Sequence, residues 1–328
     1  MRGRLTSSIG FLWVCLASAS AAQTDPAPAP AVHPCESQAG PTKAVCRAGY
    51  DAISVMTPIA ALAASGGNPS LGSAAGGEKF GHLLVTVRGS FLTAVLPATS
   101  YDGVGDTVPV ARRLPVAVPS VDLRFTLLRK PLPMGAASVD FLATITGVPR
   151  GATQYIRFGD EVRGVGGLVL GFGYGLRIGV APKLPMPTAS LNITRHDMPR
   201  FTVGAVAAGS NFAYTLSASA MNVRLLAGRR FGAFELTAGG GADLIKGDYS
   251  LIYLDPVAKT LLPRADSTFS TMRLLTVANG AMYLGKIARL TFEGGFQIGK
   301  DEKLPTQFDG LNTKSGRFFG GVGLGFKL

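Results

Sequence analysis

Charged side chains recur at alternate positions within the apolar segments of this 328-residue chain. Between residues 121 and 127, for example, Asp122 and Arg124 alternate with apolar residues. This two-residue period is typical of a β-strand that has one apolar face and one polar face. The charged residues that we predict for the polar faces of such strands are Arg88, Asp122, Arg124, Asp140, Arg177, Arg224, Glu235, Asp243, Arg273, Arg289, Glu293, Arg317 and Lys327.

These charged residues have two possible roles if the polar faces turn toward the interior of the protein. Unpaired buried charge is costly, so the residues must form ion pairs or contact water. In a narrow interior, arginine–carboxylate pairs fill the space between the strands. In a wider interior, an arginine-biased, water-filled lumen passes anions or other polar solutes. The sequence leaves both interpretations open, and we treat the set as candidate lumen-lining residues.

Catalytic and metal-binding chemistry has few candidate residues, because the chain contains only three histidines. His33 lies in a proline-rich stretch, His82 begins a predicted strand, and His196 lies in a tight turn that we expect on the periplasmic side. A hydrolase needs a nucleophile or an activated water beside a histidine and a carboxylate. We recognise neither this arrangement nor a Cys/His cluster with metal-ligand spacing, so we predict no enzyme activity, no metal and no cofactor.

The first residues of the chain have the pattern of a secretory signal peptide, which we assign to residues 1–22. Arg2 and Arg4 precede a short apolar core, and small residues surround the expected cleavage site. Residues 23–34 form a linker rich in proline and alanine. The sequence therefore predicts an exported protein.

The composition of the chain is typical of a membrane protein without transmembrane helices. Its mean hydropathy is +0.28 and only 16% of its residues are charged, yet no segment after the signal reads as a membrane-spanning helix. A closed β-barrel satisfies all backbone groups within a membrane, and it is the expected alternative. The net charge of +12 comes from dispersed lysines and arginines rather than from a dense patch, so nucleic acid is not an expected partner.

Residues 35–79 are predicted to form a periplasmic N-terminal helical segment. Cys35 and Cys46 are the only cysteines after the signal, and in an oxidising compartment we expect them to form a disulfide. Residues 42–65 have a helical pattern that Pro58 is expected to break, and the sequence from Gly66 to Pro69 ends it. The segment either caps the periplasmic mouth, enters the lumen as a plug or packs on the rim. Of these, packing on the rim is the preferred interpretation.

Residues 80–328 are predicted to form the barrel, because the alternating pattern repeats many times between turn-rich segments. We count eleven strands, including residues 200–208, and add residues 153–159 to obtain an even number. The fold class is therefore all-β, a transmembrane antiparallel barrel of about twelve strands, with ten to fourteen possible. One segment, residues 212–228, changes the phase of its alternation near Met221, which predicts a β-bulge.

Several short motifs resemble those of known outer-membrane proteins. Residues 317–328 (RFFGGVGLGFKL) resemble the C-terminal strand of bacterial outer-membrane barrels, which closes the barrel and is read by the insertion machinery. The motifs MTPIAAL (56–62), GGNPSLGS (66–73), FGHLLVTV (80–87), LPVAVPSVDL (114–123) and GLVLGFGYGLR (167–177) resemble an uncharacterised family of bacterial outer-membrane barrels. That family is loosely similar to outer-membrane long-chain fatty-acid transporters. The resemblance implies an outer-membrane location and transport, and it supplies no catalytic residues.

We therefore expect passive transport of a small or amphipathic solute through an outer-membrane barrel. The alternative is a closed structural or adhesive barrel without a transport path, and an outer-membrane hydrolase is a third and weaker interpretation. The expected partners are outer-membrane lipid and, through the C-terminal strand, the barrel-insertion machinery. The sequence identifies neither the solute nor the oligomeric state.

Overall fold

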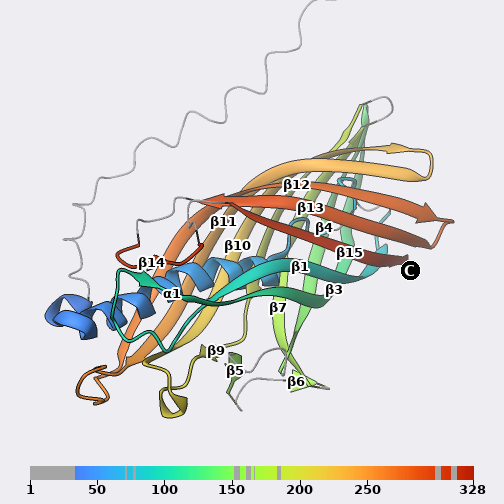
Figure 1. Ribbon diagram of the computed structural model, residues 1–328. Helices are drawn as coiled ribbons and strands as arrows, with labels where there is room; N and C mark the ends of the chain where they lie inside the picture. Colours follow the sequence, from blue (N-terminus) through green and yellow to red (C-terminus); the bar gives the residue numbers. More distant parts are fainter. Residues whose placement is uncertain are drawn as a thin grey trace, which may run out of the picture.

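A computed structural model describes residues 34–70, 72–76, 79–150, 156–159, 164–165, 167–182, 186–299, 304–311 and 316–328. Ten antiparallel strands within these residues form a closed barrel (Figure 1). They are β1 (Leu83–Pro97), β3 (Val110–Leu132), β4 (Gly135–Pro149), β7 (Leu168–Pro182), β8 (Thr188–Asp197), β10 (Phe212–Phe231), β11 (Phe234–Tyr253), β12 (Ala265–Leu284), β13 (Ala288–Gly299) and β15 (Arg317–Lys327).

The barrel closes through its first and last strands. β1 pairs with β3 on one side and with β15 on the other, and Leu84 lies opposite Lys327 in this last pairing. Each wall strand therefore has two antiparallel neighbours, which removes the open edges that a membrane does not tolerate. The prediction of an all-β antiparallel barrel is confirmed, and the strand number lies at the lower limit of the expected range.

Two segments counted as strands from the sequence do not belong to the wall. β9 (Phe201–Val203) pairs with the end of β10 and with β5 (Ile156–Phe158), and together they form a short ribbon beside the barrel. A 3₁₀ helix, η2 (Val206–Ala208), follows β9. Part of the predicted strand at residues 153–159 lies outside the described residues. Because neither segment is a wall strand, the predicted direction of β8 is wrong, and His196 lies at the opposite end of the barrel from the one predicted.

The two ends of the barrel differ in the length of their connections. At one end β3–β4, β10–β11 and β12–β13 are joined by turns of two or three residues. At the other end the chain makes long excursions, which include η2, β5, β6 (Gly164–Val165) and a two-stranded ribbon of β2 (Thr107–Val108) and β14 (Gln307–Phe308). We call these the short-turn end and the long-loop end. The last residue, Leu328, lies at the short-turn end, where its N–H donates to the Leu83 carbonyl.

The outer face of the wall carries an apolar belt. Outward residues such as Leu176, Leu225 and Leu236 are at least half exposed. On β11 the belt extends from Phe234 to Leu244, which is about 25 Å along the axis for strands tilted by about 40°. Beyond it, outward positions become polar, beginning with Lys246. This is the height of the lipid-facing band of outer-membrane barrels.

The change of phase near Met221 is not a bulge, because the register between β10 and β11 is continuous from Phe212 to Phe231. Inward residues of β10 are apolar at the long-loop end, where Tyr214 and Leu216 are fully buried, and become polar at Asn222. Outward residues change in the opposite sense, from polar residues to the belt. The predicted bulge is therefore wrong. The alternation changes phase because the inner and outer faces of one continuous strand exchange polar and apolar character near Met221.

Helix α1 (Gly40–Ser65) lies inside the barrel rather than on its rim (Figure 1). It packs mainly against β10, β11 and β1, and almost all of its residues from Val45 onward are buried. The helix continues through Pro58, contrary to the predicted break, because burial on all sides outweighs the roughly 3 kcal/mol cost of an internal proline. No helix in the described part of the chain is long and apolar enough to cross a membrane by itself.

Candidate functional site: two clamps in the barrel lumen

The charged residues predicted for the polar faces of the strands lie inside the barrel. Those from Arg88 to Glu293 are at most 7% exposed. Arg317 is half-buried, and its guanidinium donates to the Val55 carbonyl of α1 at 3.3 Å. Lys327 is also half-buried and lies at the short-turn end, 6.0 Å from the centroid of the Tyr283 ring. The two-residue alternation therefore placed these residues on the inner face.

The chain that follows α1 runs through this charged interior, and we call its described residues, 66–70 and 72–76, the lumen segment. The helix ends as predicted at Gly66, whose φ of +60° favours glycine and whose N–H donates to the Leu62 carbonyl at 2.9 Å. A Cβ on Gly67 would lie 2.6 Å from the ring of Phe319. The pair of glycines therefore lets the backbone turn and approach the wall closely.

Three wall residues hold the first turn of the lumen segment. Glu293 accepts the N–H of Asn68 at 3.1 Å and that of Gly67 at 3.5 Å. Arg88 donates to the Asn68 carbonyl at 3.2 Å, and Arg224 donates to the Gly67 carbonyl at 3.1 Å. The N–H and C=O groups of both residues are thus bound by charged side chains. We call Arg88, Arg224 and Glu293 the first clamp.

Further polar residues of the wall hold the arginines of the first clamp in place. Arg88 forms an ion pair with Asp122 at 3.3 Å. Arg224 forms a buried ion pair with Asp243, which also accepts a hydrogen bond from Gln297 at 2.7 Å. Both side chains of the Arg224–Asp243 pair are only 1% exposed, so their charges must compensate each other.

Glu235 binds the lumen segment nearer the short-turn end. One oxygen of Glu235 accepts the hydroxyl of Ser73 at 2.8 Å and the N–H of Ala74 at 3.3 Å. Its other oxygen accepts the hydroxyl of Tyr283 at 2.5 Å. This carboxylate therefore connects the lumen segment to the end of β12.

Two arginines complete this second group of contacts. Arg177 donates to the Ser73 carbonyl at 2.9 Å, and Arg124 donates to the Ala75 carbonyl at 3.1 Å. Arg124 also donates to the hydroxyl of Ser70 at 3.2 Å. We call Arg124, Arg177 and Glu235 the second clamp. Together the two clamps use six of the predicted lumen residues to bind the chain's own backbone.

Sequence reasoning missed the partners of these residues, which are backbone groups of Gly67, Asn68 and Ser73 to Ala75. Backbone groups have no residue signature, because every residue carries them. The only local signal was the turn-rich run GGNPSLGS that follows the helix.

The remaining members of the predicted set, Asp140, Arg273 and Arg289, are buried within the wall. Asp140 lies opposite Arg177 in the pairing of β4 with β7, and Arg273 lies opposite Asp243 in the pairing of β11 with β12. Charges of opposite sign therefore face each other across neighbouring strands, as the arginine–carboxylate interpretation expects.

Of the three histidines, His33 lies outside the described residues, and His82 and His196 lie at opposite ends of the barrel. His82 lies just before β1 at the short-turn end, and His196 lies near the long-loop end of β8, with its ring packed against Gly173. Among the described residues, no group of three His, Cys, Asp or Glu side chains is placed to hold a metal ion.

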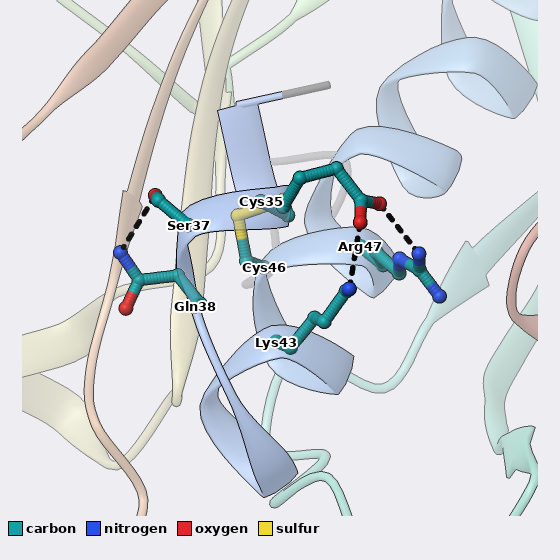
Figure 2. The surroundings of a disulfide bond; sticks show 7 residues. Cys35, Ser37, Gln38, Lys43, Cys46 and Arg47 are labelled. Atoms are coloured by element: carbon teal, nitrogen blue, oxygen red, sulfur yellow. Dashed lines mark hydrogen bonds and ion pairs between the residues drawn. A yellow bond between two sulfur atoms is a disulfide. The ribbon is translucent and has the colours of Figure 1, made fainter. Parts of the chain in front are cut away.

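The expected disulfide between Cys35 and Cys46 is present, and it joins η1 (Pro34–Ser37) to the first turns of α1 (Figure 2). Glu36 lies beside it and accepts hydrogen bonds from Lys43 at 2.7 Å and from Arg47. These two cations lower the pKa of the Glu36 carboxyl to about 2. The start of the helix is therefore fastened by one covalent and two ionic contacts.

No protein-family model and no curated protein sequence matches this chain. Similar solved structures include the outer membrane protease OmpT of Escherichia coli, with a TM-score of 0.38 and 10% identity over 76% of this chain and 97% of that one. The translocator domain of the autotransporter NalP of Neisseria meningitidis has a TM-score of 0.38 and 11% identity over 76% of this chain and 90% of that one. The toluene transporter TodX of Pseudomonas putida has a TM-score of 0.28 and 10% identity over 81% of this chain and 97% of that one. The strand pairing described above, rather than these similarities, establishes the closed antiparallel β-barrel.

Proposed function

We propose that this chain is a bacterial outer-membrane protein whose barrel is closed by its own N-terminal segment in the resting state. The apolar belt and the signal-like start of the sequence support the location. The observation that carries the closed state is the pair of clamps, which bind the lumen segment through both its N–H and its C=O groups. A structural barrel without an open path is therefore favoured over an open porin.

The closed state follows from the contents of the lumen. With its side chains an α-helix is about 10–12 Å wide, and α1 is buried on all sides between the wall strands. The lumen segment continues from the helix toward the short-turn end, where the second clamp binds it. A solute would have to displace charge-assisted hydrogen bonds, which are stronger than bonds between neutral groups.

Passive transport is a second candidate, which requires release of the lumen segment. The inward charged residues of the predicted set comprise seven arginines and Lys327, against five carboxylates. Once the segment is released, this excess of positive charge favours anions over cations. We also propose that β15 is the strand that the insertion machinery reads, as the resemblance implies.

Planar-bilayer recording of the purified protein tests the closed state. We expect the wild-type protein to insert without producing steady conductance at any voltage. Steady conductance of the folded wild-type protein would reject the closed state and favour the transport candidate. If current is observed, reversal potentials in a salt gradient report whether the path selects anions, as the arginine excess predicts.

A further inference from the structure

The turns at the short-turn end of the barrel contain neither acidic nor neutral polar residues. Tight turns usually include Asn, Asp or Ser beside glycine and proline. The described ranges 79–81, 128–134, 229–234 and 284–287 instead consist of apolar residues, glycine, proline and cations. Their charged residues are all exposed, and we call them the basic rim: Lys79, Arg129, Lys130, Arg229, Arg230 and Lys286.

The long-loop end differs from the short-turn end, because its exposed charges have both signs. Asp102, Asp106 and Asp309 are exposed in its connections. Asp266 forms an ion pair there with Arg264 at 2.8 Å. The ranges that hold the basic rim contain no carboxylate of their own. The exposed surface of these turns is therefore positively charged, and it attracts an anionic partner.

The basic rim lies directly at the edge of the apolar belt, which begins on β11 at the first residue of that strand. Arg229 lies opposite the outward residue Leu236 in the pairing of β10 with β11, so it faces outward as well. Lys130 lies opposite Ala137, and it alternates with the exposed residues Leu128 and Leu132 on the outer face of β3. Because long cationic side chains extend from an apolar surface toward polar surroundings, these cations lie at the depth of lipid headgroups.

The tips of the same turns carry exposed apolar side chains. Phe80, Met134 and Ile287 are each at least two-thirds exposed. Apolar residues beside lysine and arginine are typical of surfaces that lie in the membrane interface, where the apolar groups enter the acyl boundary and the cations contact headgroups. An acidic protein would match the charge of the rim, but it would not account for the continuity of the rim with the apolar belt. The observations therefore favour lipid.

We propose that the basic rim binds anionic phospholipid, whose phosphate headgroup has a net negative charge, in the leaflet at the short-turn end. The inference rests on the proposed outer-membrane location, and in bacterial outer-membrane barrels this leaflet faces the periplasm. Arginine and lysine donate charge-assisted hydrogen bonds to phosphate oxygens. Each lysine or arginine near an anionic surface contributes about 1 kcal/mol, which is roughly a five-fold preference. The rim thus selects the lipid around the barrel and fixes the depth of the barrel in the membrane.

Competition between two lipids that have the same acyl chains tests this proposal. The purified full-length protein in detergent is mixed with equal amounts of phosphatidylglycerol, which is anionic, and phosphatidylcholine, which is zwitterionic. Native mass spectrometry measures the bound ratio, and heat-dependent migration in detergent gels checks that each variant is folded. The rim variant removes three cations from the short-turn end: Lys130→Gln, Arg229→Gln and Lys286→Gln. The matched control removes three exposed cations from the long-loop end: Arg200→Gln, Lys259→Gln and Arg264→Gln.

We expect the wild-type protein to prefer phosphatidylglycerol. The rim variant should lose at least roughly five-fold of this preference, whereas the control should stay within about two-fold of the wild type. The preference should also fall between about 0.1 M and about 1 M salt, because the screening length falls from about 10 Å to about 3 Å. Equal binding of the two lipids by the wild-type protein would overturn the proposal and favour an acidic protein as the partner. A preference that survives in the rim variant would overturn it as well.

Lipid selection is measured on the purified barrel, so its outcome does not depend on the closed state that conductance tests. Fractionation of cells tests the location separately. Recovery of the protein from another membrane would reject the outer-membrane location without changing the result of the lipid competition. None of the substituted residues belongs to either clamp, so the variants leave the contacts of the lumen segment in place.

Discussion

Replacing Glu293 by alanine tests how firmly the lumen segment is held. The variant loses the wall carboxylate that binds the N–H groups of Gly67 and Asn68. The bond from Asn68, at 3.1 Å, is charge-assisted, and such bonds contribute roughly 1.5–3 kcal/mol. The bond from Gly67, at 3.5 Å, lies at the limit of hydrogen-bond geometry and adds little.

This loss converts directly into an expected opening of the barrel. Since 1.4 kcal/mol corresponds to a factor of ten, the population with a released segment rises roughly 10- to 150-fold. We expect Glu293→Ala to show brief openings in planar bilayers, with an open fraction that exceeds the wild-type fraction by this factor. Glu293→Gln keeps the shape and one acceptor oxygen, so it should open less often than the alanine variant.

The control is the folded state of each variant, measured by heat-dependent migration in detergent gels, because an unfolded barrel also changes the current. A folded Glu293→Ala protein that remains as silent as the wild type would refute the role of the first clamp. Equal opening of the alanine and glutamine variants would show that the carboxylate charge contributes nothing to holding the segment.

Three further predictions concern the buried ion pair, the apolar belt and the Glu36 carboxyl. Asp243→Ala leaves Arg224 buried without its partner and should lower the free energy of urea unfolding by about 3–5 kcal/mol, more than Asp243→Asn does. Equal losses in the two variants would argue against an ionic contribution. Leu225→Arg places a charge in the belt and should lower the free energy of unfolding by about 2–4 kcal/mol. Ser217→Arg lies beyond the belt on the same face of β10 and should be tolerated. A similar loss of folded protein in both variants would contradict the assigned belt. Glu36, beside the disulfide, should titrate near pH 2 by NMR. Because its folded pKa is depressed, its contribution to stability is present above the unfolded pKa of about 4.5 and is lost as the pH falls toward 2. A midpoint near 4.5 would exclude the contacts with Lys43 and Arg47.

The strand alternation was readable from the sequence because it is a local property. In a strand, successive side chains point to opposite faces whatever their neighbours are. The alternation alone therefore predicts that Arg88, Arg177 and Glu293 face inward, and all three are buried in the structure. The disulfide and the end of α1 at Gly66 were also predicted from residues close together in the chain.

The strand number was harder to predict, because it depends on which segments pair around the whole wall. The three residues Phe201–Val203 do form a strand, but their partners are β5 and the far end of β10. A short segment has the same period inside and outside the wall, so its place is decided only by its neighbours. Counting both this segment and residues 153–159 as wall strands gives β8 the wrong direction.

Only the tertiary structure decided what fills the barrel. The sequence of α1 is apolar enough to pack on a rim, a lipid surface or an interior, and its pattern alone does not choose among them. The choice follows from the closed wall, which surrounds the helix with Tyr214, Leu216 and Leu251. It also follows from the clamps, whose targets are backbone groups that every residue has in common. The sequence thus determined which side chains face inward, whereas the closure of the barrel determined that they bind the chain's own N-terminal segment.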